Sequence, residues 1–164
     1  MIQTDKMLTQ AYEMSEDGNY AAALRLYDLI LKQNPQNIDA LINKGVTLQN
    51  LGRVKQSIRL YDRALKINPN HLDALLNKGS SLHTLGNYQD AMTCYDKALQ
   101  IDKRCAMALA YKGLSLGEIG DLSNALKHFK KALSIDKNYD LALVSKKTIQ
   151  DMLKSIKEKR AKTL

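Results

Sequence analysis

The chain has 164 residues, of which 45% are hydrophobic and 26% charged, and its formal net charge is +8. This length fits a single domain with its own hydrophobic core, and no run approaches the ~20 apolar residues of a membrane-spanning helix. The first residues lack the basic-then-apolar order of a secretory signal, so we expect a cytoplasmic protein. Only two prolines, among many Ala, Leu and Lys residues, favour an all-helical protein.

The sequence repeats with a period of 34 residues. Seven of the eight glycines fall into two columns of this period, namely Gly18, Gly52, Gly86 and Gly120, and Gly45, Gly79 and Gly113. An aromatic column keeps the same spacing, at Tyr27, Tyr61, Tyr95 and Phe129. Four repeats therefore occupy residues 4–37, 38–71, 72–105 and 106–139 without insertion or deletion.

Each repeat predicts two helices, because its apolar residues recur at helical spacing. In the second repeat, Leu41 and Leu48 share one face of the first helix. Gly52 is placed to end that helix, since a left-handed C-terminal residue costs little only for glycine. The small residue Gly45 lets the paired helices approach closely, and Tyr61 fills the space beside it.

Residues 140–157 predict one further helix, which we expect to cap the stack. Terminal repeats need such a cap with a polar outer side to cover the last apolar face. The apolar stripe of this helix consists of Ala142, Leu143, Ile149, Leu153 and Ile156. Residues 158–164 have little to bury, so we expect them to fray.

The glycine, aromatic and proline columns resemble the tetratricopeptide repeat (TPR), a 34-residue helix-turn-helix unit. The resemblance covers the four repeats in register. It implies an all-α fold, a right-handed α-solenoid of antiparallel helix pairs that forms a TPR superhelix, within a single domain 1–164. It also implies a non-enzymatic protein–protein interaction scaffold. In this family a peptide or helical segment of a partner usually lies in the concave groove lined by the first helices.

A helical wheel assigns the groove face of the first helices. That face contains five carboxylates and no Lys or Arg, although the chain carries 25 basic residues. We therefore expect a neutral or basic, amphipathic protein or peptide partner. The candidate groove residues are Leu8, Tyr12, Asp39, Ile42, Asn43, Val46, Asp73, Leu76, Asn77, Tyr111 and Leu114. In the alternative interpretation the apolar residues pack between neighbouring first helices and leave a narrow polar groove.

Some members of this family hold the acidic C-terminal tail of a chaperone with a clamp of Lys, Asn and Arg. Only the asparagine matches here, at Asn43 or Asn77 depending on the frame. The basic positions of the clamp carry Leu8, Asp73 and Asn77 in one frame, and Ile42, Met107 and Tyr111 in the other. The comparison therefore argues against a chaperone tail as the partner.

The sequence gives no sign of a catalytic or metal site, and we expect neither an enzyme nor a cofactor. His71, His83 and His128 are scattered, and none has a second ligand at metal spacing. Cys94 and Cys105 do not form a CxxC pair, so two free thiols in a reducing cytosol are expected. No Ser/His/Asp or Cys/His set is brought together by the repeat positions.

Two other functions stay open. Residues 146–164 contain seven basic and two acidic residues, so the chain could be an electrostatic adaptor that docks on nucleic acid or an anionic membrane surface. The lack of interleaved aromatic residues in this tail argues against nucleic acid. In the third hypothesis the chain is a self-associating structural module, a homo-oligomer joined through the cap helix or the groove.

Two charged columns predict ion pairs between neighbouring repeats. The aspartates are Asp28, Asp62 and Asp96, and the lysines that follow each by sixteen residues are Lys44, Lys78 and Lys112. We predict that each lysine pairs with the aspartate of the preceding repeat; in the alternative, both columns are solvated. At the fourth junction Lys130 replaces the aspartate and Lys146 follows, so two like charges meet and the cap helix should sit more loosely there.

Overall fold

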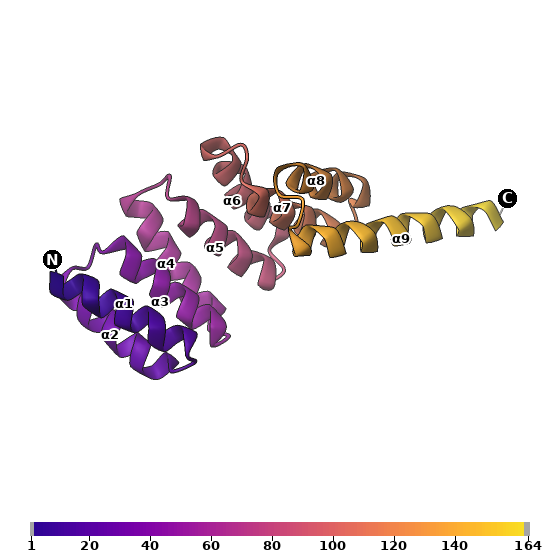
Figure 1. Cartoon of the computed structure of the whole chain (residues 1–164). Helices are drawn as coiled ribbons and strands as arrows, with labels where there is room; N and C mark the ends of the chain where they lie inside the picture. Colours follow the sequence, from indigo (N-terminus) through magenta and orange to yellow (C-terminus); the bar gives the residue numbers. More distant parts are fainter. Residues whose placement is uncertain (1, 163–164) are drawn as a thin grey trace. The chain divides into compact units, whose positions relative to one another are not determined.

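The computed structural model describes residues 2–162, which form helices joined by short turns, with no strand in that range (Figure 1). The helices are α1 (Ile2–Glu16), α2 (Tyr20–Gln33), α3 (Ile38–Asn50), α4 (Val54–Ile67), α5 (Leu72–Thr84), α6 (Tyr88–Ile101), α7 (Ala106–Glu118), α8 (Leu122–Ile135) and α9 (Asp140–Lys162). Each predicted repeat holds two of them, which confirms the all-α class. Within the described range no helix has the length and apolar character to cross a membrane.

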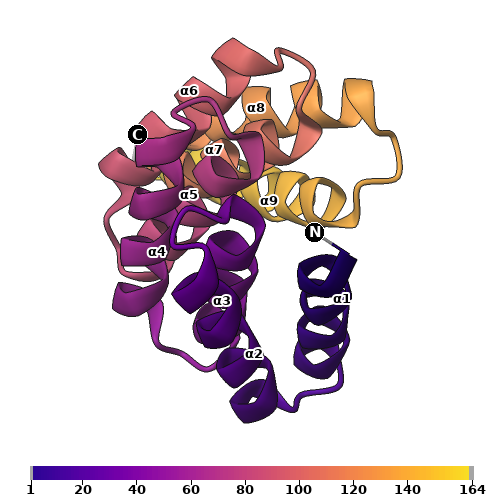
Figure 2. The same ribbon diagram turned by 90° about the vertical axis from the view of Figure 1, so that its left-hand side faces the viewer.

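The chain divides into two compact units, Met1–Leu85 and Gly86–Leu164, and the division falls inside the predicted repeat 72–105. In the first unit, each helix from α1 to α5 packs on the next, and the first helices α1, α3 and α5 also touch in order (Figure 2). In the second unit α6 to α9 pack in sequence, and α7 also touches α9. Each unit therefore has one layer of first helices and one layer of second helices.

The helix-ending glycines adopt the left-handed conformation that the sequence predicted. Gly52 has φ of 72°, and the next amide, that of Arg53, donates to the Leu48 carbonyl at 2.8 Å. Gly120 repeats this turn in the second unit, with φ of 82°. These bonds satisfy carbonyl groups that the helix end leaves unpaired.

The second glycine column marks the closest helix approach. A Cβ atom at Gly45 would lie 2.5 Å from Cε1 of Tyr61, and one at Gly113 would lie 2.9 Å from Cε1 of Phe129. Both rings are fully buried or nearly so. The predicted pairing of a small residue with an aromatic one is thus confirmed in each unit.

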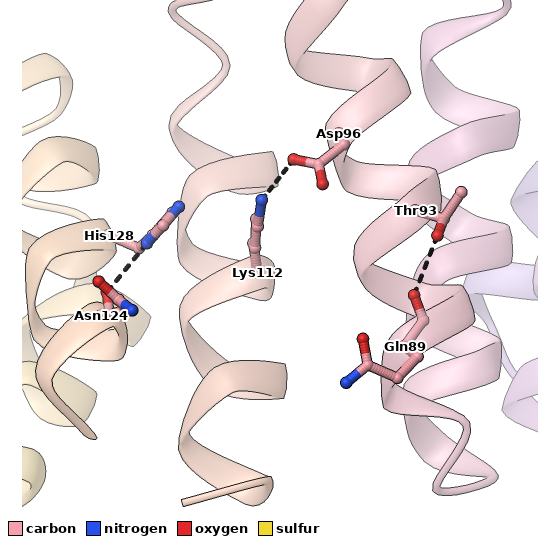
Figure 3. A network of polar contacts seen from close by, with 6 residues as sticks. All are labelled: Gln89, Thr93, Asp96, Lys112, Asn124 and His128. Carbon is pink, nitrogen blue, oxygen red and sulfur yellow. Dashed lines mark hydrogen bonds and ion pairs between the residues drawn. The ribbon is translucent and has the colours of Figure 1, made fainter. Parts of the chain in front are cut away.

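The three predicted ion pairs are present. The Nζ–Oδ1 distances are 2.5 Å for Lys44–Asp28, 2.6 Å for Lys78–Asp62 and 2.5 Å for Lys112–Asp96. Figure 3 shows the last pair, in which Asp96 on α6 points toward Lys112 on α7. The aspartate heads are more exposed than the lysines, whose stems lie along the helix surface. Each pair joins a second helix to the first helix of the next repeat.

Helix α9 differs in two respects from the expected cap. It continues to Lys162, so residues 158–162 of the predicted frayed tail are helical, while residues 163–164 lie outside the described range. Ala142 and Ile149 are buried as predicted, but Leu143 and Ile156 are 42% and 39% exposed. The stripe prediction is wrong for these two, because within the described chain no second helix follows to cover them.

Candidate binding groove

In the first unit, α1 and α3 border a shallow, open hollow of about 380 Å³ on the predicted groove face. The α1 side supplies Leu8, Thr9 and Tyr12, and the Tyr12 side chain is 51% exposed. The α3 side supplies Asp39 and Asn43. An exposed aromatic side chain beside such a hollow offers a partner an apolar contact of the kind that binding sites use.

The lining of this hollow is acidic. Asp5 lies in the first turn of α1 and Asp39 in the first turn of α3, and both are exposed. Among the described residues, no lysine or arginine lines the hollow. The lining therefore has negative charge, although the whole chain is basic.

Asn43 and Asn77 occupy equivalent positions on α3 and α5. Both are half-buried, and neither side-chain amide forms a hydrogen bond to another residue in the described part of the chain. Each amide can both donate and accept, as the backbone of a bound peptide requires. Asp73, one turn before Asn77 on α5, is exposed and lies in the first turn of that helix.

Other candidate groove residues belong mainly to the core. Ile42 and Leu76 are each only 6% exposed, and Leu8 and Val46 are partly buried against the core cluster that contains Ile42. For these residues the structure agrees with the alternative interpretation, in which they pack between neighbouring first helices. These side chains form the floor of the groove and expose little surface to a partner.

Gln49, in the last turn of α3, belongs to a polar cluster. Its Oε1 atom accepts from Ser81 Oγ at 2.9 Å and from the Tyr61 hydroxyl at 3.3 Å, while its Nε2 atom donates to Ser80 Oγ at 3.3 Å. This cluster fixes α3 to α4 and α5. Gln49 therefore has a structural role beside the groove.

The second unit has its own hollow of about 310 Å³, between α7 and α9. Of the predicted residues, Leu114 lines it, whereas Tyr111 is half-buried against Tyr95, with ring centroids 5.8 Å apart. Helix α9 contributes Ile149, which the sequence predicted as part of the cap stripe, and four residues that the sequence analysis did not single out, namely Val144, Ser145, Thr148 and Met152. Two of these are well exposed, Val144 at 67% and Met152 at 46%.

A signal for these four residues is present in the sequence. Val144 stands one period after Ala110 and two after Leu76, so the groove columns continue into a fifth first helix. The prediction treated residues 140–157 only as a cap and did not continue the groove columns into them, so it missed these four residues. Helix α9 is both a cap and a groove wall.

The histidines and cysteines do not gather at the groove. Among residues 2–162, no group of three or more His, Cys, Asp or Glu side chains could hold a metal ion. Cys94 and Cys105 are both buried, and neither forms a disulfide. His128 on α8 donates from Nδ1 to the Asn124 carbonyl at 2.9 Å (Figure 3), and burial lowers the pKa of its ring.

Layers of helix pairs with a hollow on the first helices define a helical-repeat interaction scaffold. The model of the tetratricopeptide repeat family matches residues 36–104 and 71–138. The chain belongs to the tetratricopeptide repeat family. Proteins of this family are typically non-enzymatic scaffolds for protein–protein interaction.

Solved structures agree with this fold. MamA 41-end from Desulfovibrio magneticus RS-1 has a TM-score of 0.75 at 20% identity, covering 96% of each chain. TTC0263, a thermophilic TPR protein of Thermus thermophilus, has a TM-score of 0.79 at 20% identity, covering 92% of this chain and 82% of that one. The first TPR of Spaghetti (RPAP3), bound to the HSP90 peptide SRMEEVD, has a TM-score of 0.69 at 19% identity, covering 72% and 94%. At these identities the likeness shows the fold alone. No curated protein matches the chain.

Proposed function

We propose that the hollow between α1 and α3 binds an extended or helical segment of a partner protein, and that this segment is neutral or basic and amphipathic. The observation that carries the proposal is the lining of the 380 Å³ hollow, which combines an exposed tyrosine with aspartates and has no cation among its described residues. A lysine or arginine of the partner would pair with Asp5 or Asp39, and an apolar side chain would pack on Tyr12.

The hollow between α7 and α9 extends the proposal to the second unit. Its exposed Val144 and Met152 offer apolar contacts, and Glu118 is again a carboxylate without a neighbouring cation in the described lining. The repeat therefore places similar chemistry on the first helices of both units. We take each hollow as a binding surface of its own unit.

The relative bound to an acidic peptide does not supply the partner for this chain. The groove residues here include Asp5, Asp39 and Asp73, and no basic side chain of the described chain lines the hollow between α1 and α3. An acidic chaperone tail would meet like charges, which costs affinity. We therefore propose that this groove selects against such tails.

The test is a fluorescence polarisation titration with two labelled peptides of equal length, one of alternating lysine and leucine and one of alternating glutamate and leucine. We expect the lysine peptide to bind the full chain, with the affinity lowered in Tyr12→Ala and in Asp39→Asn. The matched controls are Leu29→Ala, since Leu29 is a 49% exposed residue of α2, and Asp90→Asn, since Asp90 lies in the first turn of α6.

The controls separate groove binding from general effects. Asp39 and Asp90 both complement a helix N-terminus, so both Asn variants lose that stabilisation, but only Asp39 lines the hollow. Equal weakening by Asp39→Asn and Asp90→Asn would contradict the proposal. A rise in molecular mass with concentration that Tyr12→Ala abolishes would identify a second copy of the chain as the occupant.

A further inference from the structure

A second hollow, of about 430 Å³, lies in the first unit between α2 and α4, with α3 as its floor. Its floor is apolar, because Leu48 of α3 and Leu60 of α4 line it and are only 5% and 8% exposed. Lys44 and Leu48 project from α3 on a different side from Asp39 and Asn43, as the ~100° turn per residue requires. The hollow is thus separate from the groove described above.

The rim of this hollow is strongly basic. Arg53, Arg59 and Arg63 line it, and the one carboxylate in the described lining, Asp28, is bound to Lys44 at 2.5 Å. None of the three guanidinium groups forms an ion pair within residues 2–162. Arg63 is oriented by one bond, from Nη2 to the Pro35 carbonyl at 3.1 Å.

The beginning of α4 adds positive potential at the same place. Arg53 is the N-cap residue of α4, and its side chain makes no capping hydrogen bond within the described chain. The first turn of α4 contains no acidic residue either. Its amide groups and the positive end of the helix dipole therefore lack the anionic partner that such an end favours.

The second unit shows what fills this position when a carboxylate is available. Asp121 stands at the position of Arg53, two periods later, and its side chain caps α8 by accepting from the Asn124 amide at 3.2 Å. Lys127 and Lys131 stand at the positions of Arg59 and Arg63. At the corresponding position of α4, Arg53 supplies no carboxylate, and the first turn of that helix contains none either.

We propose that this arginine pocket binds an acidic peptide segment of a partner protein. A carboxylate of the segment lies at the start of α4 between Arg53 and Arg59, and an apolar side chain lies on Leu48 and Leu60. Planar guanidinium groups bind carboxylates through paired hydrogen bonds. The apolar floor and the absence of an aromatic side chain from the described lining favour a peptide over nucleic acid, which would use stacking surfaces.

This proposal goes beyond the binding function proposed for the groove. The two sites can be tested separately, because the groove should bind a basic peptide and the arginine pocket an acidic one. The probe is the labelled glutamate–leucine peptide, titrated against the full chain, with single-stranded oligothymidylate as a competitor. The test variant is Arg53→Gln with Arg59→Gln, which leaves the Arg63 bond to Pro35 intact. The control is Lys127→Gln with Lys131→Gln, which also removes two positive charges, here from the second unit. These lysines stand at the positions of Arg59 and Arg63, since Asp121 stands at the position of Arg53.

We expect the test variant to weaken glutamate–leucine binding by about tenfold or more, since two charge-assisted contacts are lost, while its melting temperature stays near that of the wild type. The control variant should bind as the wild type does. Absence of binding to the wild type, equal weakening by both variants, or equal binding of a glutamine–leucine peptide would each overturn the proposal. Tighter binding of oligothymidylate with the same dependence on the arginines would show that the pocket serves nucleic acid instead.

Discussion

Replacing Gly45 by alanine should destabilise the chain, although alanine is the better helix former. Helix propensity alone favours the substitution by about 1 kcal/mol. The new Cβ atom would lie 2.5 Å from Cε1 and 2.9 Å from Cζ of Tyr61, whereas carbon atoms in contact prefer about 3.5–4.0 Å. Tyr61 is fully buried, so its ring cannot move aside into solvent. Overpacking of this kind costs about 1–3 kcal/mol. This cost exceeds the gain in helix propensity except at its lower limit, so we expect a net loss of up to about 2 kcal/mol.

The assay is urea denaturation followed by circular dichroism, with Gly117→Ala as the matched control. A Cβ atom at Gly117 would meet Ile149 Cδ1 at 3.6 Å, an ordinary contact, so this variant should be neutral or slightly stabilised. In the first repeat, which contains Tyr27, Ala11 stands at the position of Gly45 and is fully buried. A methyl group is therefore tolerated at this position where the two helices are spaced for it. If Gly45→Ala were as stable as Gly117→Ala, the close approach of α3 and α4 would not limit the packing.

Three further predictions concern stability. In a double-mutant cycle, Asp28→Asn and Lys44→Gln should show a coupling free energy of at most about 1 kcal/mol, since the ion pair is partly exposed. This coupling should shrink in high salt, and a coupling that salt leaves unchanged would refute an ionic origin. Burial raises the pKa of Tyr27 from 10.0 to about 12, so the folded state keeps the phenolic proton to higher pH than the unfolded state does. The resulting stabilisation is present below pH 10 and should be lost between pH 10 and 12. In alkaline denaturation, Tyr27→Phe should reduce this loss. Asn37 caps α3 by accepting from the Ala40 amide at 2.8 Å, so Asn37→Ala should cost about 1 kcal/mol in thermal melts while Gln36→Ala costs little.

Much of the fold followed from periodicity. The 34-residue spacing placed both helices of every repeat, because one unit repeated in register has to fold each time in the same way. Gly52 and Gly120 marked helix ends because only glycine adopts the left-handed conformation at little cost. The pairing of Asp28 with Lys44 could also be inferred, since a spacing kept across three junctions has the same geometry at each.

The tertiary structure decided which side chains are available to a partner. A helical wheel puts Tyr12 and Ile42 on the same face of their helices, yet Tyr12 is 51% exposed and Ile42 only 6%. The difference arises because α3 has a first helix on each side, α1 and α5, whereas α1 has only α3. The arginine pocket was equally invisible in the sequence, because Arg53 and Arg59 acquire an apolar floor only when α2 and α4 pack across α3. The period therefore fixed the angle of each residue on its own helix, and the neighbouring helices determined whether that residue is core or surface.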